Sequence, residues 1–201
     1  RDPEMSRGLG DVYKRQIPKI QEYQYKLLKY YTEHYRIQKY EPCSGYIQFM
    51  FIDLCPQSFY GLYDWWGIPK KGLQAILESN APVGAFAKHK DYLDSLYIVN
   101  DTDGALGECE LTWIITETLN GELVEKGSVK AEVPADSRVM VKTFEKEYGK
   151  GQKWNLTLIL SDNSGKCMAK NTYQDICTLL SRVDGHPDRM SHEFGMRLYW
   201  A

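Results

Sequence analysis

Apolar residues recur along this chain with three different spacings, and each spacing predicts a different kind of element. Over residues 17–40 the apolar and tyrosine side chains lie three and four positions apart, at Ile20, Tyr23, Leu27, Leu28, Tyr31 and Tyr35. This is the spacing of one buried face of an α-helix. Pro18 suits a first helical turn and Glu41-Pro42 a helix end. Lys26, Lys29, Glu33 and Arg36 are expected on the opposite, polar face.

A near-continuous apolar run follows over residues 45–53, which is typical of a strand buried on both faces of a parallel sheet. By the period of two, Phe49, Phe51 and Asp53 share one side of that strand. An aromatic cluster comes next, and a second helix is predicted over residues 73–78. Helix, buried strand and helix form a fragment of an α/β architecture. Because one strand cannot make a sheet, the other strands are expected from sequence upstream of Ile17.

Beyond Asp91 the pattern changes to short strands separated by turn signals, as in a β-sandwich. Asn120-Gly121 predicts a two-residue hairpin turn, and residues 162–165 predict another turn. Alternation within the strands points Trp113 and Trp154 inward. Pro82 and Gly84 interrupt the periodicity, which puts the domain boundary within residues 79–91. The strands are expected at residues 95–100, 109–118, 122–133, 138–144, 154–161, 166–173 and 195–200.

Composition excludes several classes of function. The 201 residues carry a formal net charge of -2, with a pI near 6.1, so the chain has no basic field for nucleic acid. Its apolar runs are far shorter than a membrane span. The five cysteines form no CxxC pair, which argues against zinc and disulfide frameworks and is compatible with the cytoplasm, although the compartment stays open. No cofactor fingerprint or metal-ligand spacing occurs, and the Asp101-Thr-Asp103-Gly104 stretch is expected to be a plain turn.

Two features are candidates for chemistry. Asp53 ends the predicted buried strand, where it either contributes to a ligand-binding face or caps the following loop through backbone amides. Tyr60, Tyr63, Trp65 and Trp66 either stack on sugar rings or seal the joint between strand and helix, and burial in the joint is the expectation. Lys70 and Lys71 stand at a helix start, where the helix dipole does not favour cations. We expect both to be solvated, unless a partner elsewhere binds them.

These residues carry a family resemblance. Residues 24–71, with Gly45, Phe49, Ile52-Asp53, Pro56 and the run from Asp64 to Lys70, resemble the last helix, eighth strand and following loop of the catalytic barrel in glycoside hydrolase family 2. Residues 92–201 resemble the β-sandwich that follows the barrel in mannosidase-like members, the mannosidase immunoglobulin/carbohydrate-binding-module-like domain. The closest matches there are residues 171–173 and 193–199. Phe49 stands where the family has a sugar-stacking Trp, and Ile52 where it has an Asn.

The resemblance implies a mainly β fold, with an immunoglobulin-like β-sandwich over residues 92–201 preceded by a helix–strand–helix remnant of a (β/α) barrel over residues 17–82. Residues 1–16 lack periodicity and are expected to be a non-native or disordered leader. The implied activity is that of a retaining, exo-acting β-glycosidase, β-mannosidase- or β-galactosidase-like, with a carbohydrate substrate and no cofactor. Asp53, Phe49, Trp65 and Trp66 are the expected substrate-binding residues.

No catalytic residue is assigned in this chain. The family cleaves with two glutamates that follow the fourth and seventh barrel strands, and both are expected upstream of Ile17. Glu22, Glu33 and Glu41 match neither motif. The expectation is therefore an inactive fragment that packs against a missing upstream barrel, braced by the sandwich. The alternative is a non-catalytic carbohydrate-binding module, which requires a row of exposed aromatic side chains on the sandwich.

Overall fold

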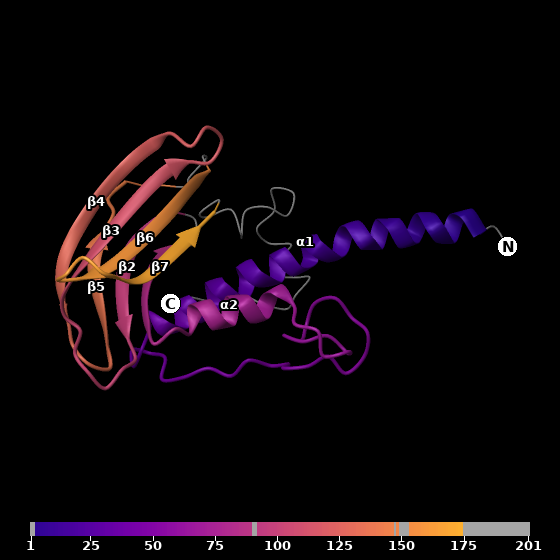
Figure 1. Cartoon of the computed structure of the whole chain (residues 1–201), viewed down its shortest axis with the longest axis horizontal. Coiled ribbons are helices and arrows are strands. Elements are labelled where there is room, and N and C mark those ends of the chain that lie inside the picture. The colour runs from indigo at the N-terminus through magenta and orange to yellow at the C-terminus, as the bar shows by residue number, and fades with distance from the viewer. Residues whose placement is uncertain (1–2, 90–91, 147, 149–152, 175–201) are drawn as a thin grey trace. The chain divides into compact units, whose positions relative to one another are not determined.

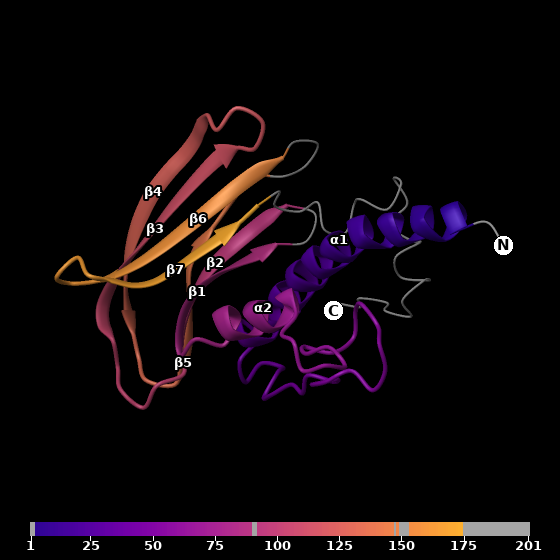
Figure 2. The same ribbon diagram turned by 45° about the vertical axis from the view of Figure 1, so that its right-hand side comes forward.

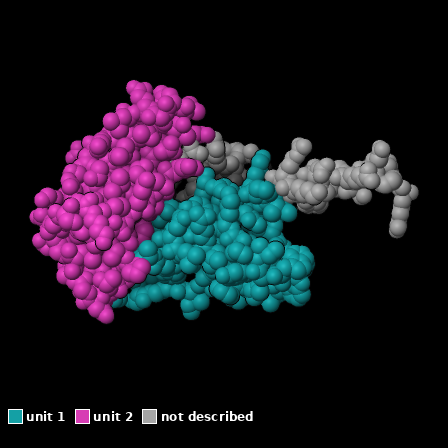
Figure 3. All heavy atoms as spheres, viewed as in Figure 1, with its two compact units in different colours: residues 1–81 teal, residues 82–201 magenta. Residues whose placement is uncertain are grey.

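The structure is a computed structural model that describes residues 3–89, 92–146, 148 and 153–174, with side chains from residue 16 onward. The chain forms two compact units, Arg1–Ala81 and Pro82–Ala201 (Figure 3). Their division lies within the residues 79–91 where the sequence places a boundary. Of the elements in the described residues, the first unit contains the two helices and the second contains the seven strands, most of which are labelled in Figure 1. The mainly β fold, a β-sandwich preceded by helices, is confirmed.

Helix α1 spans Pro3–Arg36, so it begins well before residue 17. Residues 3–16 have a helical backbone and are therefore not a disordered leader, whereas their being a non-native leader stays a prediction. This stretch lacks an apolar stripe, but Glu, Met, Arg, Leu, Lys and Gln all have good intrinsic helix propensity. Pro18 consequently lies inside the helix. Helix α2 spans Lys71–Ser79, so it begins two residues earlier and ends one residue later than predicted.

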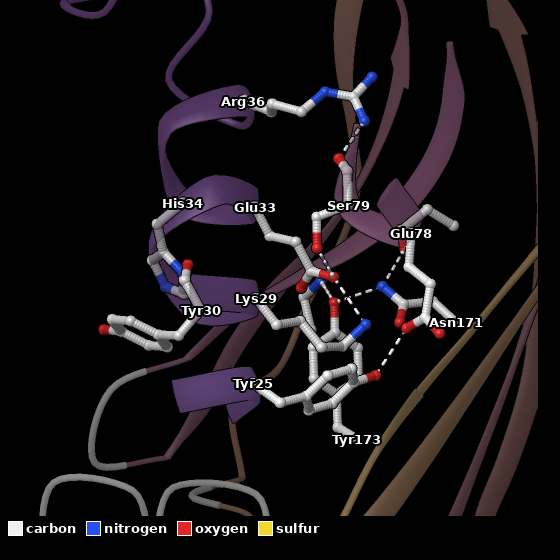
Figure 4. A network of polar contacts seen from close by, with 12 residues as sticks. Tyr25, Lys29, Tyr30, Glu33, His34, Arg36, Glu78, Ser79, Asn171 and Tyr173 are labelled. Atoms are coloured by element: carbon white, nitrogen blue, oxygen red, sulfur yellow. Dashed lines mark hydrogen bonds and ion pairs between the residues drawn. The ribbon is translucent and has the colours of Figure 1, made fainter. Parts of the chain in front are cut away.

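The expected polar face of α1 is largely buried, which corrects the sequence prediction. Lys29, Glu33 and Arg36 are each less than a tenth exposed. They are buried because they bind each other and α2: Lys29 Nζ lies 2.9 Å from Glu33 Oε1, and Arg36 Nη1 donates to Ser79 O at 2.5 Å (Figure 4). Tyr25 Oη also donates to Glu78 Oε2 at 2.6 Å. Charged side chains of a helix can thus be buried where each of them finds a polar partner.

The predicted strand over residues 45–53 is not formed, and this too is a correction. Residues 45–50 form no bridge, and Ile52 makes only an isolated bridge to Tyr63. Ile47 is 94% exposed and Phe49 81%. A barrel strand is held by hydrogen bonds to a neighbour on each side, and none of the seven described strands, which all belong to the second unit, pairs with this segment.

The second unit is a sandwich of two antiparallel sheets, with strand orders β1-β2-β5 and β4-β3-β6-β7 (Figures 1 and 2). Its six later strands agree with the predicted strands to within two residues at each end. The immunoglobulin-like class of this sandwich stays a prediction. The strands are β1 (Val83–His89), β2 (Leu93–Asn100), β3 (Gly107–Glu117), β4 (Leu123–Val133), β5 (Ser137–Thr143), β6 (Trp154–Asp162) and β7 (Cys167–Tyr173).

Strand β1 was missed, so the sandwich starts before residue 92. It pairs antiparallel with β2 from Val83 opposite Asn100 onward. Pro82 and Gly84 suggested a loop, but Pro82 precedes the first strand residue. The Phe86 ring fills the space beside Gly84, where an added Cβ would lie 2.3 Å from the ring. The predicted strand over residues 195–200 and the motif at residues 193–199 lie outside the described residues.

The sandwich core consists of the alternating positions that the sequence predicted to point inward. From β3 and β6 these positions include Trp113 and Trp154, and both are buried as expected. Trp113 lies opposite Gly127 of β4, where an added Cβ would be 2.3 Å from the indole. At the sheet edges, Tyr173 Oη accepts from Ala87 N at 3.0 Å, which connects β7 to β1. The fully buried apolar core includes Leu93, Leu96, Ile98, Leu111, Ile115, Leu156, Leu158 and Leu160.

One of the two predicted turns is confirmed. Asp162 Oδ1 accepts hydrogen bonds from the amides of Ser164 and Lys166, and Gly165 has a φ of 80°. The hairpin after β3 differs from the prediction because its connection spans residues 118–122. Only Gly121 adopts positive φ there, and Asn120 instead accepts a side-chain hydrogen bond from Glu122 N. A two-residue type I′ turn needs positive φ at both positions.

Candidate functional site

The sequence-predicted site residues lie on a loop of the first unit, residues 53–70, and on the extended segment before it. The base of this loop is closed by an ion pair between Lys70 Nζ and Asp53 Oδ2, whose side chains are 2% and 0% exposed. Lys70 stands at the N-cap of α2 and Asp53 at the end of the extended segment. The expectation that Lys70 is solvated is wrong, and the alternative, a partner elsewhere, is the observed arrangement. Lys71 is half exposed and pairs with Glu22 at 2.6 Å.

The second oxygen of Asp53 is also occupied. Its Oδ1 accepts from Gly61 N at 2.6 Å and from Gln57 Nε2 at 3.1 Å. Two roles were predicted for Asp53, a part in a ligand-binding face or a cap of the following loop. The observed geometry is that of a loop cap. A carboxylate with both oxygens bonded inside the protein shapes the loop and leaves little capacity for another ligand.

Helix α1 holds the same loop from the other side. Gln24 is 2% exposed, and its Nε2 donates to Gly61 O at 2.9 Å and to Phe59 O. The ring of Tyr23 stacks on that of Phe59 with centroids 6.0 Å apart. Gln24 also lies against Gly72 of α2, where an added Cβ would be 2.8 Å from its Cδ. Gln24 of α1 therefore contacts both the loop and α2.

The tip of the loop is a tight turn organised by Asp64. Its Oδ1 accepts from Trp66 N at 2.9 Å and from Ile68 N at 2.8 Å. Gly67 takes a φ of 78°, a conformation that favours glycine. Asp64 N donates to Ile68 O at 2.9 Å, and Lys70 N donates to Leu62 O at 2.8 Å. We name residues 64–68 the aromatic turn, since they present Trp65 and Trp66.

The aromatic side chains of this region are exposed, which corrects the expectation that they seal a buried joint. Trp65 is 52% exposed and Trp66 70%, and Tyr60 is also exposed. Phe49, on the extended segment, is exposed as well. Tyr63 is half-buried and packs on Phe51 with ring centroids 5.1 Å apart. Flat apolar rings with a polar edge suit the faces of sugar rings, and they equally suit other apolar surfaces.

The sandwich offers no such aromatic row in its described residues. Trp113 and Trp154 are both buried, and Trp113 Nε1 donates to Glu125 Oε1 at 3.0 Å. Tyr148 packs edge-on against Trp154 and Phe144. Trp200 lies outside the described residues. These contacts are those of a packed core, so the carbohydrate-binding-module alternative gains no support from the two tryptophans that the structure describes.

Within the described residues, no group of three or more His, Cys, Asp or Glu side chains is arranged to hold a metal ion. Neither described helix has both the length and the apolar character that crossing a membrane requires. Gln24 and Gly61 are not among the site residues that the sequence pattern predicts. The sequence signal for the buried ion pair is the position of Lys70 at a helix start, where the helix dipole disfavours a cation that has no other partner.

Comparison with solved structures identifies the fold. Neither a protein-family profile nor a curated protein sequence matches this chain. The exo-chitosanase CsxA of Amycolatopsis orientalis matches 79% of the chain with a TM-score of 0.69 and 21% sequence identity. The β-D-mannosidase of Dictyoglomus thermophilum matches 72% with a TM-score of 0.59 and 19% identity. The expected likeness to the C-terminal part of family 2 glycoside hydrolases is confirmed at the level of the fold.

The matched region is a small part of both enzymes. The chain spans 19% of the length of the exo-chitosanase and 18% of that of the β-mannosidase.

Proposed function

We propose that this chain is the C-terminal part of a retaining, exo-acting β-glycosidase that hydrolyses O-glycosidic bonds. The observation that carries the proposal is the fold shared with an exo-chitosanase and a β-mannosidase over about three quarters of the chain. In such a mechanism one carboxylate attacks the sugar, and a second carboxyl group about 5 Å away, in its protonated form, donates its proton to the leaving oxygen. We assign neither role to a residue of this chain, so the chain by itself is expected to be inactive.

The apolar segment before Asp53 supports a barrel partner. Its exposed side chains are Ile47, Phe49, Phe51 and Ile52. Covering a side chain of this kind stabilises a protein by about 1.5–3 kcal/mol. We propose that neighbouring barrel strands of the same protein cover this segment and convert it to a strand. The proposed substrate of the complete protein is a carbohydrate.

The aromatic turn and Phe49 are the proposed sugar-contacting residues of this part. Trp65 and Trp66 are exposed on a turn whose backbone is fixed by Asp64. We assign Asp53 to the same site, because it shapes the loop that carries the two tryptophans. The sandwich has the proposed role of bracing the barrel, which agrees with the inward position of Trp113 and Trp154.

The decisive experiment is to recover the reading frame upstream of Ile17 and to express the extended protein. We expect two strand-terminal glutamates there, hydrolysis of nitrophenyl β-glycosides, and a first product with retained anomeric configuration by proton NMR. Replacing either glutamate by glutamine should abolish turnover. Upstream sequence without such glutamates would overturn the proposal.

The 201-residue chain is the matched control. We expect it to release no nitrophenol above background, whereas clear turnover would contradict the assignment of catalysis to upstream residues. If instead the chain binds glycans through the sandwich, sugar titration should perturb amide signals of the second unit. Perturbation confined to that unit would favour the carbohydrate-binding module.

A further inference from the structure

The loop that carries the aromatic turn is held by contacts at its base, its middle and its tip. Loops on protein surfaces are usually mobile and tolerant of change. Here residues 53–70 are closed at the base by a buried ion pair, held in the middle by a buried glutamine, and closed at the tip by Asp64. Asp53, Lys70 and Gln24 are buried and Asp64 is partly buried, whereas the two tryptophans of the turn are exposed.

These contacts form one continuous network from Lys70 to Gln24. Lys70 Nζ binds Asp53 Oδ2, Asp53 Oδ1 accepts from Gly61 N, and Gly61 O accepts from Gln24 Nε2. Gly61 is required at the crossing, because a Cβ there would lie 2.4 Å from Asp53 Oδ1 and 2.6 Å from Tyr63 O. Two backbone hydrogen bonds hold the residues directly before the aromatic turn: Asp53 N donates to Tyr63 O at 3.0 Å, and Lys70 N donates to Leu62 O.

A buried charge pair is a costly way to obtain stability alone. Well-packed apolar residues of similar volume often serve as well or better, because both ions lose their hydration. What a hydrogen-bonded pair adds is one defined geometry. Binding sites gain from such preorganisation, since a rigid surface has less conformational entropy to lose when a ligand binds.

We propose that Lys70 and Gln24 are positioning residues for the aromatic turn. Acting through Asp53 and Gly61, they hold the loop in the conformation in which Trp65 and Trp66 meet a sugar ring. The proposal deepens the proposed function and rests on it for the identity of the ligand. Neither residue touches the sugar in this arrangement.

The test compares two adjacent lysines of the 201-residue chain. Lys70→Met removes the buried partner of Asp53, and Lys71→Met removes the half-exposed partner of Glu22. The first readout is amide hydrogen exchange at Gly61, Trp66 and Ile68. The second is the dissociation constant for a β-1,4-linked glucosamine trisaccharide, followed by tryptophan emission.

For Lys70→Met we expect exchange at these amides and the dissociation constant both to rise about tenfold, which corresponds to about 1.4 kcal/mol. Lys71→Met should leave both within about twofold, as an exposed ion pair contributes little. Combining Lys70→Met with Asp53→Asn should recover part of the affinity, because no buried charge is then left unpaired. A folded Lys70→Met chain with unchanged exchange and affinity would overturn the proposal.

Two further arms keep the result decisive. If Lys70→Met does not fold, Gln24→Leu is measured in its place, since it removes the middle contact without leaving a charge. Unchanged exchange at Gly61 and Trp66 in that variant overturns the proposal. If the unmodified chain does not bind the trisaccharide, the proposed sugar contact fails, and hydrogen exchange alone decides whether Lys70 and Gln24 position the turn.

Discussion

The ammonium group of Lys70 and the carboxylate of Asp53 form an ion pair whose two side chains are almost completely buried, although 17 positions separate them in the sequence. The pair joins the start of α2 to the end of the extended segment. A loop of the first unit is thereby closed by charges that the solvent does not reach.

Asp53→Ala should destabilise the first unit by about 3–5 kcal/mol, because it leaves the Lys70 charge buried without its partner. The free energy of unfolding, from urea titration followed by helical circular dichroism, measures the effect. Glu22→Gln is the control, since the half-exposed pair with Lys71 should be worth at most about 1 kcal/mol. Equal losses of unfolding free energy in the two variants would contradict the prediction that the buried pair stabilises the unit more than the exposed pair does.

Gly61→Ala should destabilise the same unit by about 1–3 kcal/mol, as overpacked sites do. The added methyl group would meet Asp53 Oδ1 at 2.4 Å and two backbone atoms within 2.8 Å, and backbone does not move aside cheaply. Gly45→Ala is the control, because nothing lies within 4 Å of its Cβ position. Urea titration of both variants tests the difference, and a neutral Gly61→Ala would contradict the close approach.

Leu158→Ala should destabilise the sandwich by about 2–5 kcal/mol through lost burial and the cavity left behind. Leu158 lies on β6, opposite Trp113 of β3, and is fully buried. Leu119→Ala, at an 84% exposed position, should change stability by no more than about 0.5 kcal/mol. Differential scanning calorimetry of the two variants provides the measurement, and similar shifts in Tm would argue against the described core.

Alkaline pH should weaken the sandwich through Tyr148. Burial, the hydrogen bond to Glu125 and the charge of Glu125 together raise the pKa of Tyr148 to about 12. The folded state therefore holds the phenolic proton more tightly than the unfolded state does. The resulting stability is complete below pH 10 and is lost as the pH rises from about 10 to about 12.

Tyr148→Phe provides the comparison for that prediction. Unfolding of the variant should depend less steeply on pH in the alkaline range, and tyrosinate absorbance should lose one late-titrating group. A variant whose stability falls with pH as steeply as that of the unmodified protein would refute the assignment to Tyr148.

The strands of the sandwich were predictable from sequence because their signal is local. Alternation along β3 and β6 reports directly which side chains face the core, so Trp113 and Trp154 were placed correctly. Strand β1 was missed because Pro82 and Gly84 resemble a loop signal, and pairing with β2 overrides it. In α1, an expected polar face proved buried because Glu33, Lys29 and Arg36 find polar partners, and hydrophobic periodicity cannot represent such pairs.

By itself, the sequence determined the mainly β class and the positions of strands β2 to β7 along the chain, and it suggested Asp53, Phe49, Trp65 and Trp66 as candidate site residues. Only the tertiary structure decided that Asp53 faces Lys70, that Trp65 and Trp66 are exposed, and that residues 45–50 form no bridge. The reason is physical. Periodicity records which side of an element is apolar, whereas an ion pair across 17 positions and the pairing of a strand depend on partners distant in the sequence.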